Sequence, residues 1–268
     1  MYDLSICLTA LRKHNWKRLY DSIATSIGDY SFELILCGPH EDPPEEMQDL
    51  PNVKCIQDYG SPTRCQQRAM LAATGRYITW AADDGWYMPE DPKTVSLGQC
   101  IHHLDTVSEE KKCLVTRYNE GVGDGLGDPA SGMYCLNFHD PVRSPHYPDH
   151  FLIFNCAILP TVYFKELGGF DCQFEVCPMA FCDFGARAQL DGATVILTGL
   201  SFECTHFPGT DGDHAPVHHA QIDHDQPLYE EIWQQATAPD RIKIDINNWE
   251  EHPDLWERRF GDLTQEED

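Results

Sequence analysis

The sequence predicts an α/β fold: a mostly parallel central sheet flanked by helices and followed by an irregular C-terminal extension. Two observations lead to this prediction. Short apolar runs alternate with segments whose apolar side chains recur at helical spacing. The elements in roughly the first hundred residues come in the order strand, helix, strand, strand, helix, strand, which is typical of parallel strands joined by covering helices. No internal repeat or low-complexity linker divides the chain, so one compact domain is expected before the extension.

In the first part of the chain, each expected strand is an apolar run bounded by a turn or a helix. The expected strands are 4–11, 32–38, 52–59 and 76–84. The first expected helix, 15–27, carries apolar residues on one side, namely Trp16, Leu19, Tyr20, Ile23 and Ile27. The second, 62–75, has a proline near its start and a glycine at its C-terminal end.

The second part of the chain is less regular. The sequence predicts loops at 121–132 and 139–150, strands at 113–118, 151–160 and 193–200, and helices at 93–108, 161–171 and 179–192. Beyond residue 205 the chain is rich in His, Asp and Pro, and helical pieces are expected near 227–237 and 249–260.

The composition indicates a folded, non-secreted protein. Hydrophobic residues make up 41% of the chain, enough for a core. No leader pattern and no apolar run long enough for a membrane span is visible. The twelve cysteines are scattered, and several stand in apolar strands, which favours reduced thiols. We therefore expect a cytoplasmic protein.

The net charge of −25 restricts the partners of the protein. Such a surface repels nucleic-acid phosphates and anionic membranes unless a local basic patch intervenes. Nucleic acid is therefore disfavoured as a partner, although a local groove could still bind it. Carboxylates bind hard cations, so the charge is compatible with binding small anions through a metal ion.

Two aspartates stand side by side where the expected strand 76–84 ends, in GRYITWAADDGWYMPED (75–91). Ligands of parallel sheets bind at the carboxyl ends of the strands, so Asp83 and Asp84 are placed where a divalent cation could hold a diphosphate. The alternative is a turn or a helix cap, because Asp84-Gly85 is also a turn signal.

This stretch resembles a signature of the inverting glycosyltransferases of the GT-A fold, in particular the family 2 group. A second stretch, KELGGFDCQFEVCPMAFCDFGARAQLDGA (165–193), resembles that family's second block. Both blocks come in the expected order, and the resemblance covers about residues 2–207. Two linked blocks are more specific than either alone. The resemblance implies a GT-A (Rossmann-like) catalytic domain over 1–210.

Within that domain, the resemblance implies a nucleotide-sugar-binding half over 1–100 and an acceptor and catalytic half over 101–210. Residues 211–268 would form a lid and a helical extension. The segment 211–226 holds four His and four Asp and could bind a metal of its own, but a polar loop that folds over the donor is the preferred interpretation.

The chain departs from the family pattern at several positions. Ala82 stands where the family has the first Asp of its DxD motif, and Cys182 stands where Glu is common. The second strand ends in Cys37-Gly38-Pro39-His40 instead of an Asp-containing turn. Gln66-Gln67 replaces the usual Arg-Asn pair. These departures leave the donor nucleotide open.

The resemblance also implies roles for the metal-binding and catalytic residues. Asp84 and His206 would ligate Mn²⁺ or Mg²⁺. Asp183 would be the catalytic base that takes the proton of the acceptor hydroxyl. The alternatives are that Asp183 stabilises a helix N-terminus and that His206 is structural. Arg187, one helical turn from Asp183, is expected to pair with it or lie on the helix surface; the alternative is a phosphate ligand that reaches the site.

Donor contacts are expected from residues after the first strand and near the second helix: Thr9, Ala10, Arg12, Arg64 and Asp83. Trp86 and Tyr87 could form a floor for the acceptor sugar, since aromatic faces pack on sugar C–H groups, or they could belong to the core.

The sequence therefore predicts a metal-dependent inverting glycosyltransferase. Its donor would be a nucleotide sugar, with a UDP-sugar favoured, and its acceptor a glycan or another hydroxyl compound. Two alternatives remain at this point: a non-catalytic GT-A-like nucleotide- or sugar-binding module, and a nucleotidyltransferase. The second would be favoured by a Gly-rich phosphate loop after the first strand, which LTALRKHNW (8–16) lacks.

Overall fold

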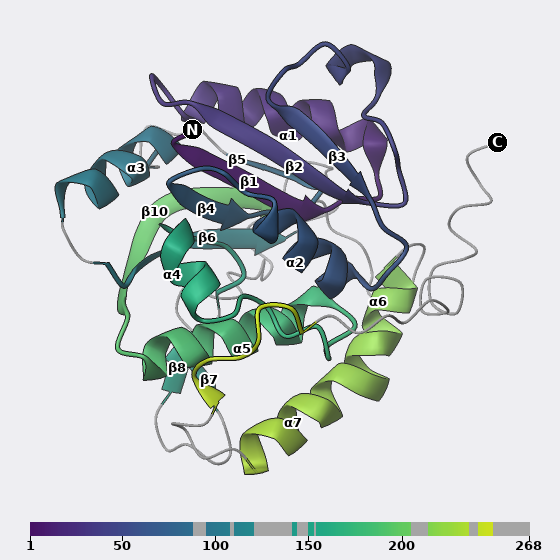
Figure 1. Ribbon diagram of the computed structural model, residues 1–268, viewed down its shortest axis with the longest axis vertical. Helices are drawn as coiled ribbons and strands as arrows, with labels where there is room; N and C mark the ends of the chain where they lie inside the picture. The colour runs from purple at the N-terminus through teal and green to yellow at the C-terminus, as the bar shows by residue number, and fades with distance from the viewer. Residues whose placement is uncertain are drawn as a thin grey trace.

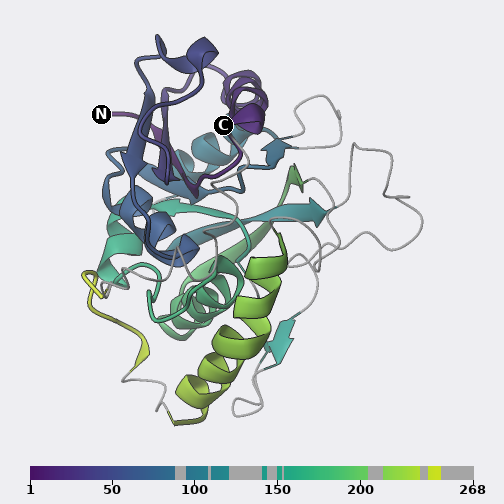
Figure 2. The same cartoon turned by 90° about the vertical axis from the view of Figure 1, so that its right-hand side faces the viewer.

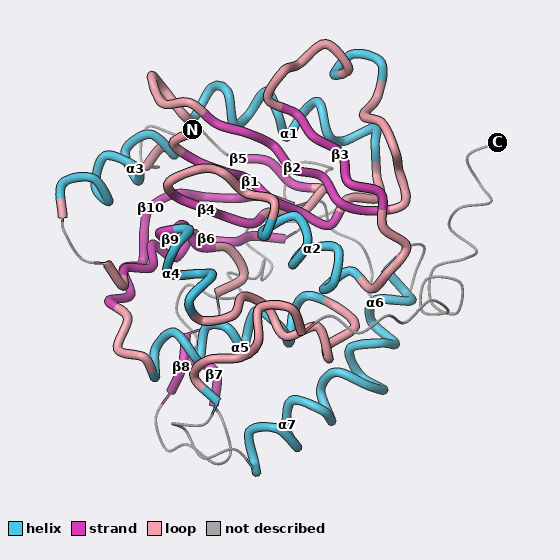
Figure 3. The backbone as a smooth tube through the Cα atoms, viewed as in Figure 1, coloured by secondary structure: helices cyan, strands magenta, loops and turns pink. Residues whose placement is uncertain are grey.

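The predicted α/β fold is confirmed. A computed structural model describes residues 1–87, 95–107, 110–120, 141–143, 150–152, 154–204, 214–235 and 241–248. Within these ranges, a mixed sheet of eight strands in the order β3-β2-β1-β4-β9-β6-β10-β5 is flanked by helices (Figure 1). The pair β7–β8 forms a separate small sheet that lies away from the main one (Figure 3).

The elements of the described part have the following bounds. The strands are β1 (Leu4–Thr9), β2 (Phe32–Gly38), β3 (Val53–Gln57), β4 (Tyr77–Trp80), β5 (Gly85–Tyr87), β6 (Lys112–Glu120), β7 (Pro141–Arg143), β8 (His150–Leu152), β9 (Ala157–Pro160) and β10 (Thr194–Cys204). The helices are α1 (Lys13–Ser26), α2 (Pro62–Leu71), α3 (Leu97–Thr106), α4 (Thr161–Glu166), α5 (Cys177–Leu190), α6 (His214–Ala220) and α7 (Gln226–Gln235), with a 3-10 turn η1 (Glu45–Met47) and a π-helical turn η2 (Gln221–Asp225).

The sheet consists of two parallel parts joined by an antiparallel strand. β1 pairs in parallel with β2 and β4, β2 with β3, and β6 with β10. β9 runs antiparallel to both of its neighbours, pairing Ile78 with Leu159 on one side and Leu114 with Ile158 on the other. β5 is antiparallel to β10 at the far edge.

Helices cover both faces of the sheet. α1 and α3 contact each other on one face, and α2, α4 and α5 lie on the other (Figure 1). Trp80 on β4 is fully buried and packs against Phe170, Phe181 and Phe184, with ring centroids 5.1, 5.6 and 5.8 Å away. This aromatic cluster joins the centre of the sheet to α5.

Two expectations for the first part of the chain were wrong in their boundaries. α2 ends at Leu71, four residues before Gly75. A Cβ on Gly75 would lie 2.7 Å from the backbone nitrogen of Ser5, so this glycine serves a close approach to β1 rather than a helix end. The expected strand 76–84 stops at Trp80, and Asp83 and Asp84 lie in a turn before β5.

In the second part, the expected strand 151–160 is two strands, β8 and β9, separated by a bend, and β7 lies in a stretch expected to be a loop. The segment expected to be a polar loop, 211–226, is helical from His214 onward, so that expectation was also wrong. The helical piece near 227–237 is confirmed as α7. The loop 121–132, the helix 249–260 and His206 lie outside the described residues.

None of the helices in the described ranges combines the length and apolar character that crossing a membrane requires.

The link between the first strand and the turn before β2 is sensitive to pH. The hydroxyl of Ser31 donates to Asp3 at 2.6 Å, its backbone N–H at 2.8 Å, and Arg76 pairs with Asp3 at 2.7 Å. The Ser31 hydrogen bonds, together with Arg76, lower the pKa of Asp3 to about 2. The folded pKa is below the unfolded value of about 3.9, so the stabilisation is present above about pH 4 and is lost toward pH 2.

The substitution Asp3→Asn should therefore reduce the free energy of unfolding at neutral pH, and the difference from the wild type should shrink between about pH 4 and pH 2. Urea unfolding at several pH values measures this. The exposed Asp29, changed to Asn, is the matched control and should give a pH-independent difference. Parallel curves for Asp3→Asn and the wild type would contradict the assignment.

Candidate functional site

A cavity of about 470 Å³ lies at the carboxyl ends of the parallel strands. Its walls come from the ends of β1, β4, β6 and β10, the start of α2, the start of α5 and one side of α6. The described lining residues are Thr9, Arg12, Pro62, Gln66, Ala81, Ala82, Asp83, Asp84, Tyr118, Asn155, Cys156, Val176, Cys177, Pro178, Met179, Phe181, Cys182, Cys204, Val217 and Gln221. The size and position are those of a small-molecule site in an open α/β sheet.

The first aspartate after β4 holds the loop that follows β1. The backbone N–H groups of Leu11 and Arg12 both donate to Oδ2 of Asp83 at 2.6 Å. The Arg12 guanidinium donates to Oδ1 at 2.5 Å. A buried carboxylate is stable when it is paired and hydrogen-bonded in this way. Asp83 is thus engaged by protein groups on both of its oxygens.

The second aspartate lies beside the same guanidinium. Oδ2 of Asp84 is 3.8 Å from Nη1 of Arg12, and the Asp84 carbonyl accepts from Arg18 at 3.2 Å. The Arg18 guanidinium in turn stacks 3.9 Å above the ring of Trp86. Asp84 lines the cavity and is 5% exposed. These contacts align the turn so that one carboxylate and one guanidinium share a cavity wall.

The described part of this wall offers few protein ligands for a divalent cation. In the described ranges, no three His, Cys, Asp or Glu side chains are grouped so that they could hold a metal ion. Asp84 can provide one carboxylate, and Mg²⁺ commonly takes one or two carboxylates and its other ligands from phosphates and water. The residues therefore fit a cation bound together with a diphosphate, and they do not form a cage for a cation alone.

The other predicted donor residues divide between the cavity and the surrounding structure. Thr9 and Arg12 line the cavity, and Ala10 is buried beside it, with its N–H bonded to the Cys37 carbonyl at 2.8 Å. Arg64 does not line the cavity; its Nε donates to Asp58 at 3.1 Å. The structure thus brings Thr9, Arg12, Asp83 and Asp84 together and leaves Arg64 outside the group.

Of the two aromatic residues predicted to meet an acceptor, neither lines the cavity in the described part. Tyr87 is fully buried and packs edge-on against Phe202 at 4.9 Å, which is a core position. Trp86 is half-buried under Arg18. For Tyr87, the core alternative is the one that the structure shows.

The predicted base lies behind the cavity wall. Asp183 is 0% exposed, and Oδ2 accepts from Nε of Arg187 at 2.7 Å. Oδ1 accepts from Nη2 of Arg241 at 2.9 Å, and Arg241 also pairs with Asp171. Asp183 is absent from the described lining of the cavity, while its neighbour Cys182 is part of it. The role of Asp183 as the catalytic base stays a prediction. In this structure the Asp183 carboxylate does not reach the cavity.

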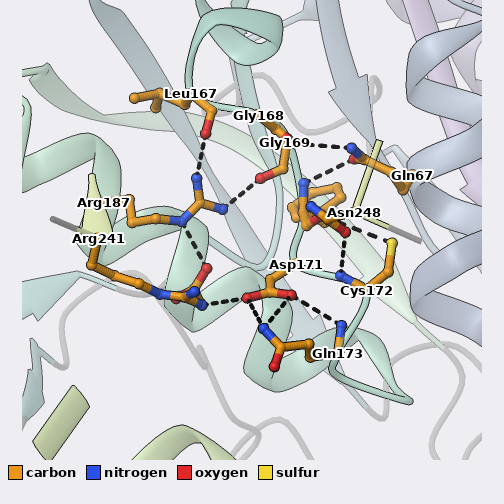
Figure 4. A network of polar contacts seen from close by, with 12 residues as sticks. Gln67, Leu167, Gly168, Gly169, Asp171, Cys172, Gln173, Arg187, Arg241 and Asn248 are labelled. Carbon is orange, nitrogen blue, oxygen red and sulfur yellow. Dashed lines mark hydrogen bonds and ion pairs between the residues drawn. The ribbon is translucent and has the colours of Figure 1, made fainter. Parts of the chain in front are cut away.

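Both arginines also secure the loop between α4 and α5 (Figure 4). Arg187 is fully buried and donates to the carbonyls of Leu167 and Gly169, so the pairing alternative for this residue is confirmed and the surface alternative is wrong. Gly168 and Gly169 have φ of +87° and +70°, a region that favours glycine. From the opposite side, Gln67 donates to the Gly168 carbonyl at 3.0 Å.

A short C-terminal segment, 241–248, completes this network. Besides Arg241, it supplies Asn248, which accepts from the Cys172 N–H at 2.8 Å and donates to the Phe170 carbonyl at 3.1 Å. Burial lowers the pKa of Arg241, but the carboxylates of Asp183 and Asp171 outweigh it and raise the pKa overall. The guanidinium is therefore a permanent positive charge inside the network.

The helical segment over 214–235 forms one side of the cavity and appears as the light-green rod in Figure 2. It is attached to the start of α5 by Asp225, whose two oxygens accept from the N–H groups of Glu175 and Val176 at 2.8 Å each. Burial raises the pKa of Asp225 against the opposing effect of these hydrogen bonds. Val217 and Gln221 of the segment line the cavity. Its predicted lid role stays a prediction.

Sequence reasoning missed three contributors to the site. Gln66 lines the cavity and joins α2 to β1, accepting from the Thr9 N–H at 3.0 Å and donating to the Cys7 carbonyl at 2.8 Å. The only sequence signal for Gln66 was that Gln66-Gln67 stands where the resembled family usually has an Arg-Asn pair. Arg241 had no local signal, and Asp225 was noticed only as part of the His- and Asp-rich segment 211–226; the partners of these two residues lie 58 and 50 residues away in the sequence.

Comparison with known proteins supports the fold at a distance. No known protein-family profile matches the chain, and no curated protein matches it. Among solved structures, residues 1–349 of the S. aureus glycosyltransferase TarS in complex with UDP align with a TM-score of 0.53 and 14% identity, over 89% of this chain and 68% of that chain. The complex with UDP-GlcNAc gives the same score and identity over 98% and 81%. A further crystal structure of S. aureus TarS matches over 98% of this chain and 49% of that chain, with a TM-score of 0.53 and 14% identity. These similarities show that the chain has a Rossmann-like fold shared with TarS.

The Arg241 contacts generate a stability prediction. The substitution Arg241→Gln takes away one of the two guanidinium groups that pair with Asp183 and the one that pairs with Asp171. Breaking a buried ion pair lowers the free energy of unfolding by about 3 kcal/mol. Urea denaturation measures the loss. Lys243→Gln, an exposed change of the same kind in the same segment, should stay within about 0.5 kcal/mol of wild type. Equal losses in the two variants would show that the network does not carry the stability assigned to it.

Proposed function

We propose that the protein is a glycosyltransferase that takes a nucleotide sugar, with a UDP-sugar favoured, and transfers the sugar to a hydroxyl with inversion. The observation that carries the proposal is the cavity at the strand ends, where Thr9, Arg12 and Asp84 share one wall. The folds of two TarS complexes support it, since their ligands are UDP and UDP-GlcNAc.

In this proposal the wall binds the donor diphosphate. The Arg12 guanidinium, oriented by Asp83, faces the diphosphate and supplies positive charge. Asp84 would hold Mg²⁺ or Mn²⁺, and His206 is proposed as a further ligand. The metal ion, when bound, would stabilise the negative charge that grows on the leaving diphosphate. Ala10 and the backbone after β1 would lie against the nucleoside.

The predicted base, Asp183, is buried and paired with two arginines. For Asp183 to accept a proton from a substrate, its carboxylate has to come to the cavity, which requires that the Arg241 contact be broken. Among the described lining residues, the carboxylates are Asp83 and Asp84. The buried position of Asp183 therefore favours a second candidate function, a non-catalytic module that binds nucleotide sugars.

A donor panel tests the proposal directly. We expect one UDP-sugar, with Mn²⁺ or Mg²⁺, to raise the melting temperature of the wild type more than GDP-, CDP- or dTDP-sugars, because a ligand that binds only the native state stabilises it. Asp84→Asn should remove the metal-dependent part of the shift. Asp49→Asn, an exposed aspartate in the loop after η1, is the control and should leave it intact. If no nucleotide sugar shifts the melting temperature with or without metal, the proposal is wrong.

A pair of matched variants decides what Asp183 does. Asp183→Asn and Asp171→Asn each remove a carboxylate that pairs with Arg241. A base role lowers kcat about 10²- to 10⁴-fold in Asp183→Asn alone. Both carboxylates have the same partner, and Asp183 does not line the cavity. We therefore expect the two variants to lose similar amounts of unfolding free energy. We also expect their kcat values to lie within about tenfold of each other. Release of UDP from the donor, normalised to folded protein, is the measurement. A selective loss of kcat in Asp183→Asn would establish it as the base.

A further inference from the structure

The residues that line the cavity form two groups with different chemistry. The side formed by the ends of β1 and β4 and the start of α2 carries charged and hydrogen-bonding groups, including Arg12, Gln66 and Asp84. A second group of lining residues, called the apolar side below, comes from the start of α5, from α6 and from the chain before β9. Its described side chains are mostly apolar or thiol-bearing and include Cys156, Cys177, Met179, Phe181, Cys182 and Val217.

The thiols on this side behave as small apolar groups. Burial raises the pKa of Cys177 and of Cys182 to about 12, and it raises the pKa of Cys156 further. These thiols are therefore neutral at physiological pH, and a neutral buried Cys packs as a small hydrophobe with a weak S–H donor. The surface they form together with Met179 and Val217 offers few partners for hydroxyl groups.

Polar atoms on this side are sparse in the described part. Gln221 and Tyr118 line the cavity, and the Asn155 carbonyl accepts from the Trp80 indole N–H. A sugar or polyol placed against this side would bring several hydroxyls, and each buried hydroxyl without a partner costs about 1–3 kcal/mol. A hydrocarbon or aromatic group has no such penalty and gains from burial.

We propose that this apolar side, defined by Cys156, Cys177, Met179, Phe181, Cys182 and Val217, binds the acceptor, and that the acceptor is an alcohol carried on an aliphatic or aromatic body. The inference rests on the proposed function, because it places the donor diphosphate against the charged group of Arg12 and Asp84. In the reaction, the acceptor oxygen forms a bond to the anomeric carbon of the donor sugar. The bond from that carbon to the diphosphate oxygen breaks, UDP leaves with the electron pair, and the hydroxyl proton passes to a base or to water.

The first experiment compares acceptors. The full chain is supplied with the UDP-sugar that shifts its melting temperature, and UDP release is measured with 2-phenylethanol and hexanol against ribitol and methyl glucoside. We expect kcat/KM at least about tenfold higher for the apolar alcohols, the size of discrimination that a hydrophobic pocket provides. Calorimetric binding of the same acceptors in the presence of UDP reports the preference without requiring turnover.

The second experiment changes the apolar side. Val217→Thr keeps the shape and adds a hydroxyl, and it should raise KM for 2-phenylethanol severalfold while UDP binding stays unchanged. Val162→Thr is the matched control, because Val162 is exposed on α4 and is not among the described lining residues. It should leave KM unchanged.

The outcomes separate the two levels of the proposal. If the chain binds a UDP-sugar but prefers ribitol or methyl glucoside, the acceptor inference is wrong and the proposed function stands. If Val217→Thr weakens UDP binding and leaves the acceptor KM unchanged, the apolar side holds the nucleotide, and the inference is wrong as well. If no donor binds at all, both are wrong.

Discussion

The geometry of the site depends on one buried carboxylate. Asp83 lies just after β4, and it binds the backbone of the loop after β1 through two N–H groups and the Arg12 side chain. Two neighbouring parallel strands thereby end in a single hydrogen-bonded unit. The adjacent Asp84 also lines the cavity, with its Oδ2 3.8 Å from Nη1 of the same Arg12. The two adjacent aspartates thus differ in their contacts: Asp83 accepts hydrogen bonds from the loop after β1 on both of its oxygens, while Asp84 lies beside the Arg12 guanidinium at the cavity wall.

The central strands and helices were predictable from local patterns, and the parts that were not depend on distant contacts. The alternation of apolar runs located β1, β2 and β4, whose residues are mostly buried, and also β3, whose residues are half-buried or exposed. The division of 151–160 could not be read in the same way. The start of β9 is set by its pairing with β4 on one side and β6 on the other. No residue within 151–160 indicates this pairing.

The site shows the same division between local and distant determinants. The sequence placed Asp84 and Arg12 at strand ends, and the structure brings them to one cavity wall. It also placed Asp183 on a helix with Arg187 four residues later, a spacing that allows the observed ion pair. It could not show which way that pair faces. The orientation is set by Arg241 and by the carbonyls of Leu167 and Gly169, which accept from Arg187.

The antiparallel strand in the middle of the sheet has a consequence for how the chain is synthesised. The first four strands can pair as soon as residues 1–80 are available, since their registers involve no later segment. The free side of β4 then presents unpaired N–H and C=O groups until Ala157–Pro160 arrives, about 80 residues later. An open strand edge of this kind can pair with another nascent chain. On the ribosome, the arrival of β9 is therefore the event that closes this edge and joins the two parts of the sheet.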